Sequence, residues 1–261
     1  MKKANLLILG VIAGIWLLVP VAGRAGLADS PNPHNFASGH YSWNTSQNFP
    51  GDPNSVCGPC HQAHKTDSSV VPLWAHDTAA ASSFTMYNTA NVPSSQMKAT
   101  VELTPRGPSL ACLSCHDGTV AINQMAGGRI LGGTADIMPL RGVVTTKADG
   151  TPDPGNLTHS HPISFIYDST LASKDKGVFD PVTHTVIQPD DTGPLRPGSS
   201  PDYTIKNFLL GGGNYVECTS CHDVHNAKGT AYSTTLNPNL VLIAGSAGGT
   251  GSVLCRSCHD K

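Results

Sequence analysis

Apolar positions are concentrated at the start of this chain, and elsewhere they form few regular patterns. A nearly continuous apolar run extends from Leu6 to Val21, shortly after Lys2 and Lys3. Beyond it, Gly and Pro occur 27 and 20 times and are spread through the sequence, so long helices are not expected. The pattern predicts short helices over 77–87, 112–122 and 218–226, a weak strand over 203–210, and little other regular structure.

The first 25 residues have the three parts of a secretory signal peptide: a basic start, an apolar run and small residues. The run of about 16 residues is short for a membrane-spanning helix, which needs roughly 20 apolar residues. Gly23-Arg24-Ala25 fits the small-x-small cleavage rule, so we expect cleavage after Ala25, with Ala22 as second choice. An uncleaved membrane anchor is the alternative.

Cysteine carries the strongest chemical signal in the sequence. All eight cysteines lie in four copies of Cys-x-x-Cys-His, whose cysteines are Cys57 and Cys60, Cys112 and Cys115, Cys218 and Cys221, and Cys255 and Cys258. This is the attachment signature of c-type haem. The two thiols form thioethers with the haem vinyl groups, and the imidazole of the next residue reaches the iron. The sequence therefore predicts four covalently attached haem c groups, with proximal ligands His61, His116, His222 and His259.

Three other readings of the cysteines are weaker. A disulfide framework suits an exported protein with an even number of cysteines, but it does not require a histidine after every second one. Zinc sites also use Cys-x-x-Cys pairs and leave the same histidine unexplained. A thioredoxin-like redox site would use one such pair rather than four. Haem attachment also fits export, because c-type cytochromes receive their haem outside the cytoplasm.

The remaining histidines outnumber the ligands that four six-coordinate irons would still need. Twelve histidines are present, and eight of them lie outside the fifth position of the motifs. Methionine is the competing axial ligand. The four methionines past the apolar run are better explained as gap-filling apolar residues. We therefore expect two histidines on every iron.

The order of the motifs suggests which histidines are distal. The first and third motifs continue to a second histidine three residues on, whereas the second and fourth continue with Asp. The chain thus reads as two modules of two haems, each preceded by one further histidine. This arrangement predicts His34, His64, His161 and His225 as the distal ligands. His76 is the strongest rival, followed by His40 and His159, while His184 is expected to be exposed in a polar loop.

A histidine three residues beyond a proximal ligand cannot reach the opposite face of the same iron. If His64 and His225 are ligands, each must serve a neighbouring haem, which would bring the haems into close pairs. Close pairs are what fast electron transfer needs.

Several longer segments resemble the doubled-CXXCH multihaem cytochromes, and more closely the OmcE-type tetrahaem extracellular cytochromes, some of which polymerise into nanowire filaments. The resemblance runs from His34 to the C-terminus. It rests on CGPCHQAH (57–64), VPLWAHDT (71–78), FTMYN (84–88), CLSCHDGTVA (112–121), HPISFIYD (161–168), YVECTSCHDVHN (215–226) and SVLCRSCHDK (252–261). The family's usual first motif is close to CHTPH, and here it reads CHQAH with both histidines retained.

This resemblance implies bis-histidine ligation of every haem and electron transport outside the cell along stacked haems. Filament-forming members pass one axial histidine to a haem of the adjoining subunit, and His34 is the natural candidate here. The implied partners are redox cytochromes or extracellular electron acceptors, with a homopolymer formed through the N-terminal arm.

The expected fold class is a multihaem cytochrome c. It is mostly coil, with short helices at the Cys-x-x-Cys-His motifs and few short strands, packed around stacked haems. We divide the chain into a signal peptide (1–25), an extended arm (26–56), a first two-haem module with a Gly-rich insertion (57–160) and a second two-haem module (161–261). Such a chain buries too little apolar surface to fold without haem.

Charge adds little to the functional picture. With 16 basic and 18 acidic side chains, the sequence offers no basic patch for nucleic acid. An electron-transfer protein rather than an enzyme is the expected function, in the periplasm, on the outer surface or outside the cell. The alternative is a multihaem oxidoreductase with one substrate-accessible haem, which would need an open iron and nearby acid–base groups.

Overall fold

The computed structural model describes residues 34, 56–67, 70–79, 84–93, 95–130, 145–147, 149, 151–186, 203–211, 213–225 and 253–260. The expected signal peptide, all of the arm except residues 34 and 56, and the rival ligand His40 lie outside these residues. Among the helices of the described ranges, none is both long and apolar enough to cross a membrane.

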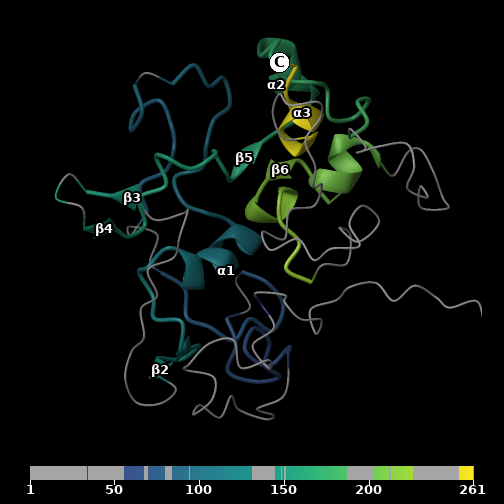
Figure 1. The fold of residues 1–261 in the computed structure, drawn as a ribbon. Coiled ribbons are helices and arrows are strands. Elements are labelled where there is room, and N and C mark those ends of the chain that lie inside the picture. The colour runs from purple at the N-terminus through teal and green to yellow at the C-terminus, as the bar shows by residue number, and fades with distance from the viewer. Residues whose placement is uncertain are drawn as a thin grey trace, which may run out of the picture.

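Helical structure in the described part is short. The α-helices are α1 (Gly107–His116), α2 (Ser169–Lys174) and α3 (Val253–Cys258). A π-helical turn, η4, covers Ile205–Leu209, and a single 3-10 turn, η5, covers Cys218–Ser220. Figure 1 shows α1 near the centre of the fold, with α2 and α3 together beside the C-terminus.

The strands form three antiparallel pairs of two residues each. β1 (Gln124–Met125) pairs with β2 (Arg129–Ile130), and β3 (Thr145–Thr146) pairs with β4 (Pro152–Asp153). The third pair joins segments that are distant in sequence, β5 (Phe165–Ile166) and β6 (Tyr215–Val216), with Phe165 opposite Val216. A segment between the second and third motifs therefore pairs with the residues directly before the third motif (Figure 1).

Two of the predicted elements differ from the structure. The predicted helix over 77–87 is wrong in its described residues, 77–79 and 84–87, where Thr85 instead forms a parallel bridge with Asn156. The predicted strand over 203–210 is also wrong, because Ile205–Leu209 coils into η4, which buries Ile205, Phe208 and Leu209 on one side. In both segments, contacts with distant residues override a weak local preference.

The predicted helices at the second and third motifs are found with different bounds. α1 begins at Gly107, with Pro in its first turn, and ends at His116. It cannot continue to residue 122 because Asp117 closes the last turn and Gly118 adopts a left-handed φ of 72°. At the third motif only Cys218–Ser220 is helical, and residues 221–225 continue as turns and irregular chain.

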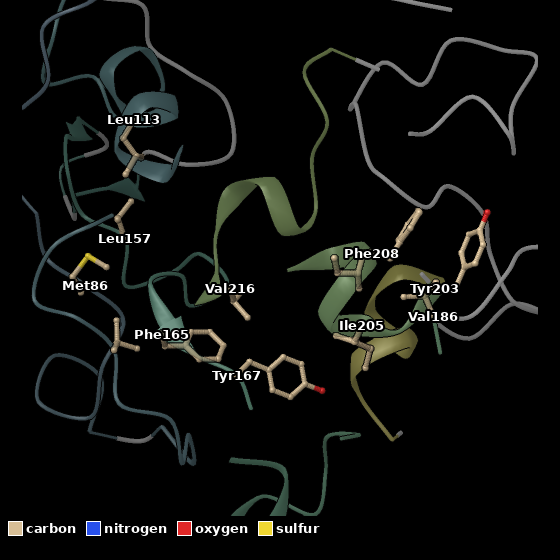
Figure 2. Close-up of a cluster of buried hydrophobic side chains, with 12 residues drawn as sticks. Met86, Leu113, Leu157, Phe165, Tyr167, Val186, Tyr203, Ile205, Phe208 and Val216 are labelled. Carbon is tan, nitrogen blue, oxygen red and sulfur yellow. The ribbon is translucent and has the colours of Figure 1, made fainter. Parts of the chain in front are cut away.

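Twelve of the buried apolar side chains form a cluster around the β5–β6 pair. Figure 2 shows Phe165, Tyr167 and Val216 lying between a group containing Leu113 of α1 and a group containing Ile205 of η4. The motifs border this cluster, since Leu254 and Cys258 of α3 pack against it. The core thus holds the chain segments around the second, third and fourth motifs in fixed relative positions.

Candidate functional site

The motifs share a local backbone geometry that follows from their spacing. In the first, third and fourth motifs the histidine N–H donates to the carbonyl of the first cysteine, each at 2.9 Å. The second motif lies in the last turns of α1. One helical turn brings residues i, i+3 and i+4 to the same side of the chain. Both thiols and the imidazole of each motif are therefore presented to one side, as the attachment of a single flat group requires.

Three of the four motif histidines lie opposite a second histidine from a distant part of the chain. His116 faces His34 with ring centres 5.9 Å apart, and His61 faces His225 at 6.4 Å. His259 of the fourth motif faces His161 at 6.2 Å. In each pair, one member is the histidine of a Cys-x-x-Cys-His motif and the other is one of the predicted distal ligands.

The separation within these pairs is that of two imidazoles on one metal ion. With metal–nitrogen bonds of about 2 Å, imidazoles on opposite sides of one ion have ring centres about 6 Å apart. Direct stacking is much closer, and the rings of Phe179 and His184 lie 3.7 Å apart at an angle of 3°. The rings of His61 and His225 are also nearly parallel, at 17°, but their 6.4 Å separation is too large for direct stacking. The ring separations are therefore those that two imidazoles holding one haem iron would have.

The hydrogen bonds of two of these histidines leave one ring nitrogen for a metal. Nδ1 of His61 donates to the carbonyl of Pro72 at 3.2 Å, and Nδ1 of His161 donates to that of Pro162 at 2.8 Å. A carbonyl oxygen only accepts, so the proton of each neutral ring sits on Nδ1. The free lone pair of each ring is then on Nε2. Histidines that ligate a metal through one ring nitrogen typically donate the N–H of the other nitrogen to a carbonyl or carboxylate in this way.

Burial keeps the His34–His116 pair uncharged, as metal ligation requires. Burial, together with the positive charges that His116, His222 and His225 can carry, lowers the pKa of His34 to about 4. The pKa of His116 is also lowered, by burial first and by His222 second. His116 of the second motif and His222 of the third motif therefore lie close together.

His76, the strongest rival as a distal ligand, is held differently. It is 3% exposed, and both of its ring nitrogens face backbone carbonyls, Nε2 that of Pro59 at 2.7 Å and Nδ1 that of Gln124 at 3.2 Å. With both nitrogens directed at carbonyl oxygens, neither is turned toward a metal. His76 instead connects the turn between the first two cysteines to β1.

The other histidines fall outside the three pairs. His64 and His159 are exposed, and neither has a ring contact with another histidine in the described part. His184, expected to be exposed, is half-buried because it stacks on Phe179. His222 of the third motif lies close enough to His34 and His116 to affect their pKa values.

Each motif has a thiol that lies close in space to a thiol of the next motif along the chain. Burial raises the pKa of Cys60 to about 12, with a further contribution from Cys115 of the second motif. Cys112 donates a hydrogen bond to Cys218 of the third motif, which raises the pKa of Cys112 and lowers that of Cys218. Burial raises the pKa of Cys221 to about 11, helped by Cys218 and by Cys255 of the fourth motif.

These thiol properties bear on the other readings of the cysteines. All eight residues are present as thiols rather than disulfides. Within the described ranges, no three Cys, His, Asp or Glu side chains converge as a zinc site would need. A redox-active Cys-x-x-Cys pair needs a thiol of lowered pKa. Burial raises the pKa of Cys115 to about 11 and that of Cys258 to about 12. The pKa of Cys218 is lowered, but by a hydrogen bond with Cys112 of another motif rather than by its own partner Cys221.

Comparison with known proteins adds no further assignment: no protein-family model matches the chain, and no curated protein matches it.

Proposed function

We propose that this chain is a tetrahaem c-type cytochrome that carries electrons between its haems in the periplasm or outside the cell. The observation that carries the proposal is the set of three histidine pairs with ring centres 5.9 to 6.4 Å apart. Each pair joins a motif histidine to a histidine that is distant in sequence, so the tertiary structure and not the motif itself brings the two rings together.

Each haem would be held by the two thiols and the imidazole of one motif, with the distal imidazole completing the iron's coordination. When bound, the haem irons supply one-electron redox chemistry. His34, His161 and His225 serve the second, fourth and first motifs. His64 is proposed for the third motif's haem, since it is the predicted distal ligand that remains.

The chain's own residues fix the ligands and exclude substrate from the irons. The carbonyls of Pro72 and Pro162 orient His61 and His161, and burial keeps His34 and His116 neutral. An iron with two imidazoles has no position open for substrate, so this arrangement favours electron transfer over catalysis. The proximity of thiols from successive motifs supports electron transfer between haems that are neighbours in chain order.

The test is to purify the exported chain from a host that attaches c-type haem, and to measure its mass and absorption spectrum. We expect the mass of the processed chain plus four haems, and a low-spin spectrum in both oxidation states. A colourless protein with the mass of the bare chain would overturn the proposal. Carbon monoxide binding to one haem of the reduced protein would instead support an oxidoreductase with an accessible iron.

A further inference from the structure

A buried carboxyl group lies directly beside the attachment points of the second and third motifs. Glu217 precedes Cys218 and is 8% exposed. Its carboxylate accepts hydrogen bonds from the hydroxyl of Ser109 on α1 and from the hydroxyl of Ser164, before β5, at 3.1 Å. Three segments that are distant in sequence therefore converge on one carboxylate.

The same hydrogen bonds connect this carboxylate to the haem-attachment cysteines. Besides donating to Glu217, the Ser109 hydroxyl accepts from the backbone N–H of Cys218 at 2.9 Å. The thiol of Cys218 in turn accepts a hydrogen bond from Cys112 of the second motif. The Ser109 hydroxyl therefore bridges the Glu217 carboxylate and the backbone of Cys218, the first attachment cysteine of the third motif. This bridge lies beside the contact between the second and third motifs.

The charge of this carboxylate is only weakly compensated. The titratable groups that face it in the described part are Arg106 and Glu102 before α1 and the thiol of Cys218, which becomes a thioether once haem is attached. Tyr215 of β6 lines the same cavity. The Arg106 guanidinium is half-exposed, 3.6 Å from the carboxylate of Glu102 and 3.9 Å from the centre of the Tyr215 ring. Its charge is therefore shared with Glu102 and screened by solvent.

A cavity gives this carboxyl group a route to water. The cavity has a volume of about 290 Å³ and is lined by Glu217 together with Pro108, Tyr215, Thr219 and Ser220, among others. A single water needs only about 10–15 Å³ of such volume, so several waters fit. A proton can therefore reach or leave Glu217 without unfolding of the core.

We propose that Glu217 takes up a proton when the haems of the second and third motifs are reduced and releases it when they are oxidised. This inference rests on the proposed function. An electron from the reductant, dithionite or an electrode, adds one negative charge to a haem, and a buried charge acts strongly on its neighbours. The carboxylate becomes a carboxylic acid with a proton from bulk water, and the reverse occurs on oxidation.

The sign of the pH dependence follows from these charges. Burial raises the pKa of Glu217, while the hydroxyls of Ser109 and Ser164 and the charge of Arg106 lower it. Haem reduction raises it further. Between the pKa of the oxidised and the reduced protein, reduction is accompanied by proton uptake, so the reduction potential falls as the pH rises.

The test compares the haem-loaded wild type with Glu217→Gln by redox titration at a series of pH values. In the variant we expect the fall of the second and third haem potentials with pH to be reduced, and about one proton fewer to be taken up per molecule on full reduction. Glu102→Gln is the matched control, because it removes the same charge from an exposed neighbour. It should keep the proton uptake of the wild type and move the pH-dependent range only to lower pH, since the Glu102 carboxylate raises the pKa of Glu217. An unchanged pH profile in Glu217→Gln, with four low-spin haems present, would overturn the inference.

A second variant keeps the test decisive if Glu217→Gln fails to acquire four haems. Ser164→Ala removes one donor to the carboxylate, which raises the pKa of Glu217 and moves the pH-dependent range to higher pH. An unmoved range in Ser164→Ala would contradict the inference. Failure of the proposed function is distinguishable from either result, because wild type would then lack four low-spin haems altogether.

Discussion

Three histidines of the described part differ in how many of their ring nitrogens face a backbone carbonyl. His61 and His161 use Nδ1 for a backbone carbonyl and leave Nε2 for another partner. His76 directs both nitrogens at carbonyls. Residue type alone does not distinguish these roles, but the hydrogen bonds do, and they predict different consequences when each imidazole is removed.

Replacing His161 by Ala should change the coordination of one haem without releasing it. In the proposed cytochrome, the thioethers of Cys255 and Cys258 would not involve His161, so all four haems should remain attached. The fourth haem would lose one of its two imidazoles and become high-spin and able to bind carbon monoxide. Electron paramagnetic resonance and carbon monoxide difference spectra measure this change.

His159→Ala is the matched control for that variant. His159 is exposed and two residues away, and it has no ring contact with another histidine in the described part. It should leave all four haems low-spin. A high-spin haem in His159→Ala but not in His161→Ala would show that the two imidazoles were assigned the wrong way round.

His76→Ala should affect stability rather than the haem spectrum. It removes a buried ring from between the carbonyls of Pro59 and Gln124. Burial lowers the pKa of His76, so the ring is neutral and its single N–H donates to one of these carbonyls, which loses its donor in the variant. We expect the free energy of unfolding to fall by about 2 kcal/mol. Guanidinium unfolding followed by circular dichroism measures this loss, and a new high-spin haem in the variant would instead identify His76 as a ligand.

At the scale of secondary-structure elements, the motifs are held by contacts with other segments more than by helices of their own. α3 is attached through its last residues: the backbone N–H of Phe179 and the hydroxyl of Tyr167 both donate to the carbonyl of Cys258, at 2.9 and 3.3 Å. The Tyr167 hydroxyl also donates to the carbonyl of Phe179 at 2.7 Å. One phenol therefore links the chain after β5 to the fourth motif.

Tyr167→Phe removes that link and keeps the ring in the core. We expect the free energy of unfolding to fall by about 1 kcal/mol, because a partly buried hydroxyl with two carbonyl acceptors is lost. Tyr215→Phe is the control, since its hydroxyl meets the exposed carboxylate of Glu102 at 3.2 Å and its loss should cost less. Equal destabilisation by the two variants would contradict this assignment.

At the scale of the whole molecule, the part that the structure describes has a small apolar core and short regular structure, so we expect folding to depend on haem. The buried cluster around β5 and β6 has twelve members, and several helices are single turns. Ordering these described residues costs more free energy than a cluster of this size returns. The haems would supply the missing apolar surface.

The chain without haem should therefore be largely unfolded. Expression in a host lacking the haem-attachment machinery gives the test material, and circular dichroism with limited proteolysis gives the measurement. We expect rapid cleavage throughout the chain, against protected fragments in the haem-loaded protein. A protease-resistant, cooperatively unfolding apo chain would contradict the prediction.

Assembly is the other property of the whole molecule, and it depends on which haem His34 serves. Its ring lies 5.9 Å from that of His116 in the same chain, and one imidazole cannot ligate two irons. Ligation within the chain and donation to a neighbouring subunit are therefore exclusive in any one state of the protein.

His34→Ala distinguishes these two arrangements by negative-stain electron microscopy and spectroscopy. If His34 acts within its own chain, the variant should retain four haems, one of which is high-spin. This result should be the same whether the protein is monomeric or forms filaments. If it acts across subunits, filaments formed by wild type should be lost in the variant while haem attachment remains. Filaments that are unchanged in the variant would end the cross-subunit hypothesis.

The sequence by itself determined what depends on residues close together along the chain. The four Cys-x-x-Cys-His motifs are readable because two thiols and an imidazole within five residues must lie on one helical turn. The scarcity of regular structure followed from the abundance of Gly and Pro. Weak local patterns were less reliable, and the predicted helix over 77–87 and strand over 203–210 were both overridden by tertiary contacts.

Only the tertiary structure decided which distant groups meet. Counting histidines proposed the distal candidates, but it could not say that His225 lies opposite His61 and His161 opposite His259, because those pairings depend on the core around β5 and β6. No pattern in the sequence marked Glu217 either, since a carboxylate becomes unusual only when burial removes it from water and other segments supply its hydrogen bonds.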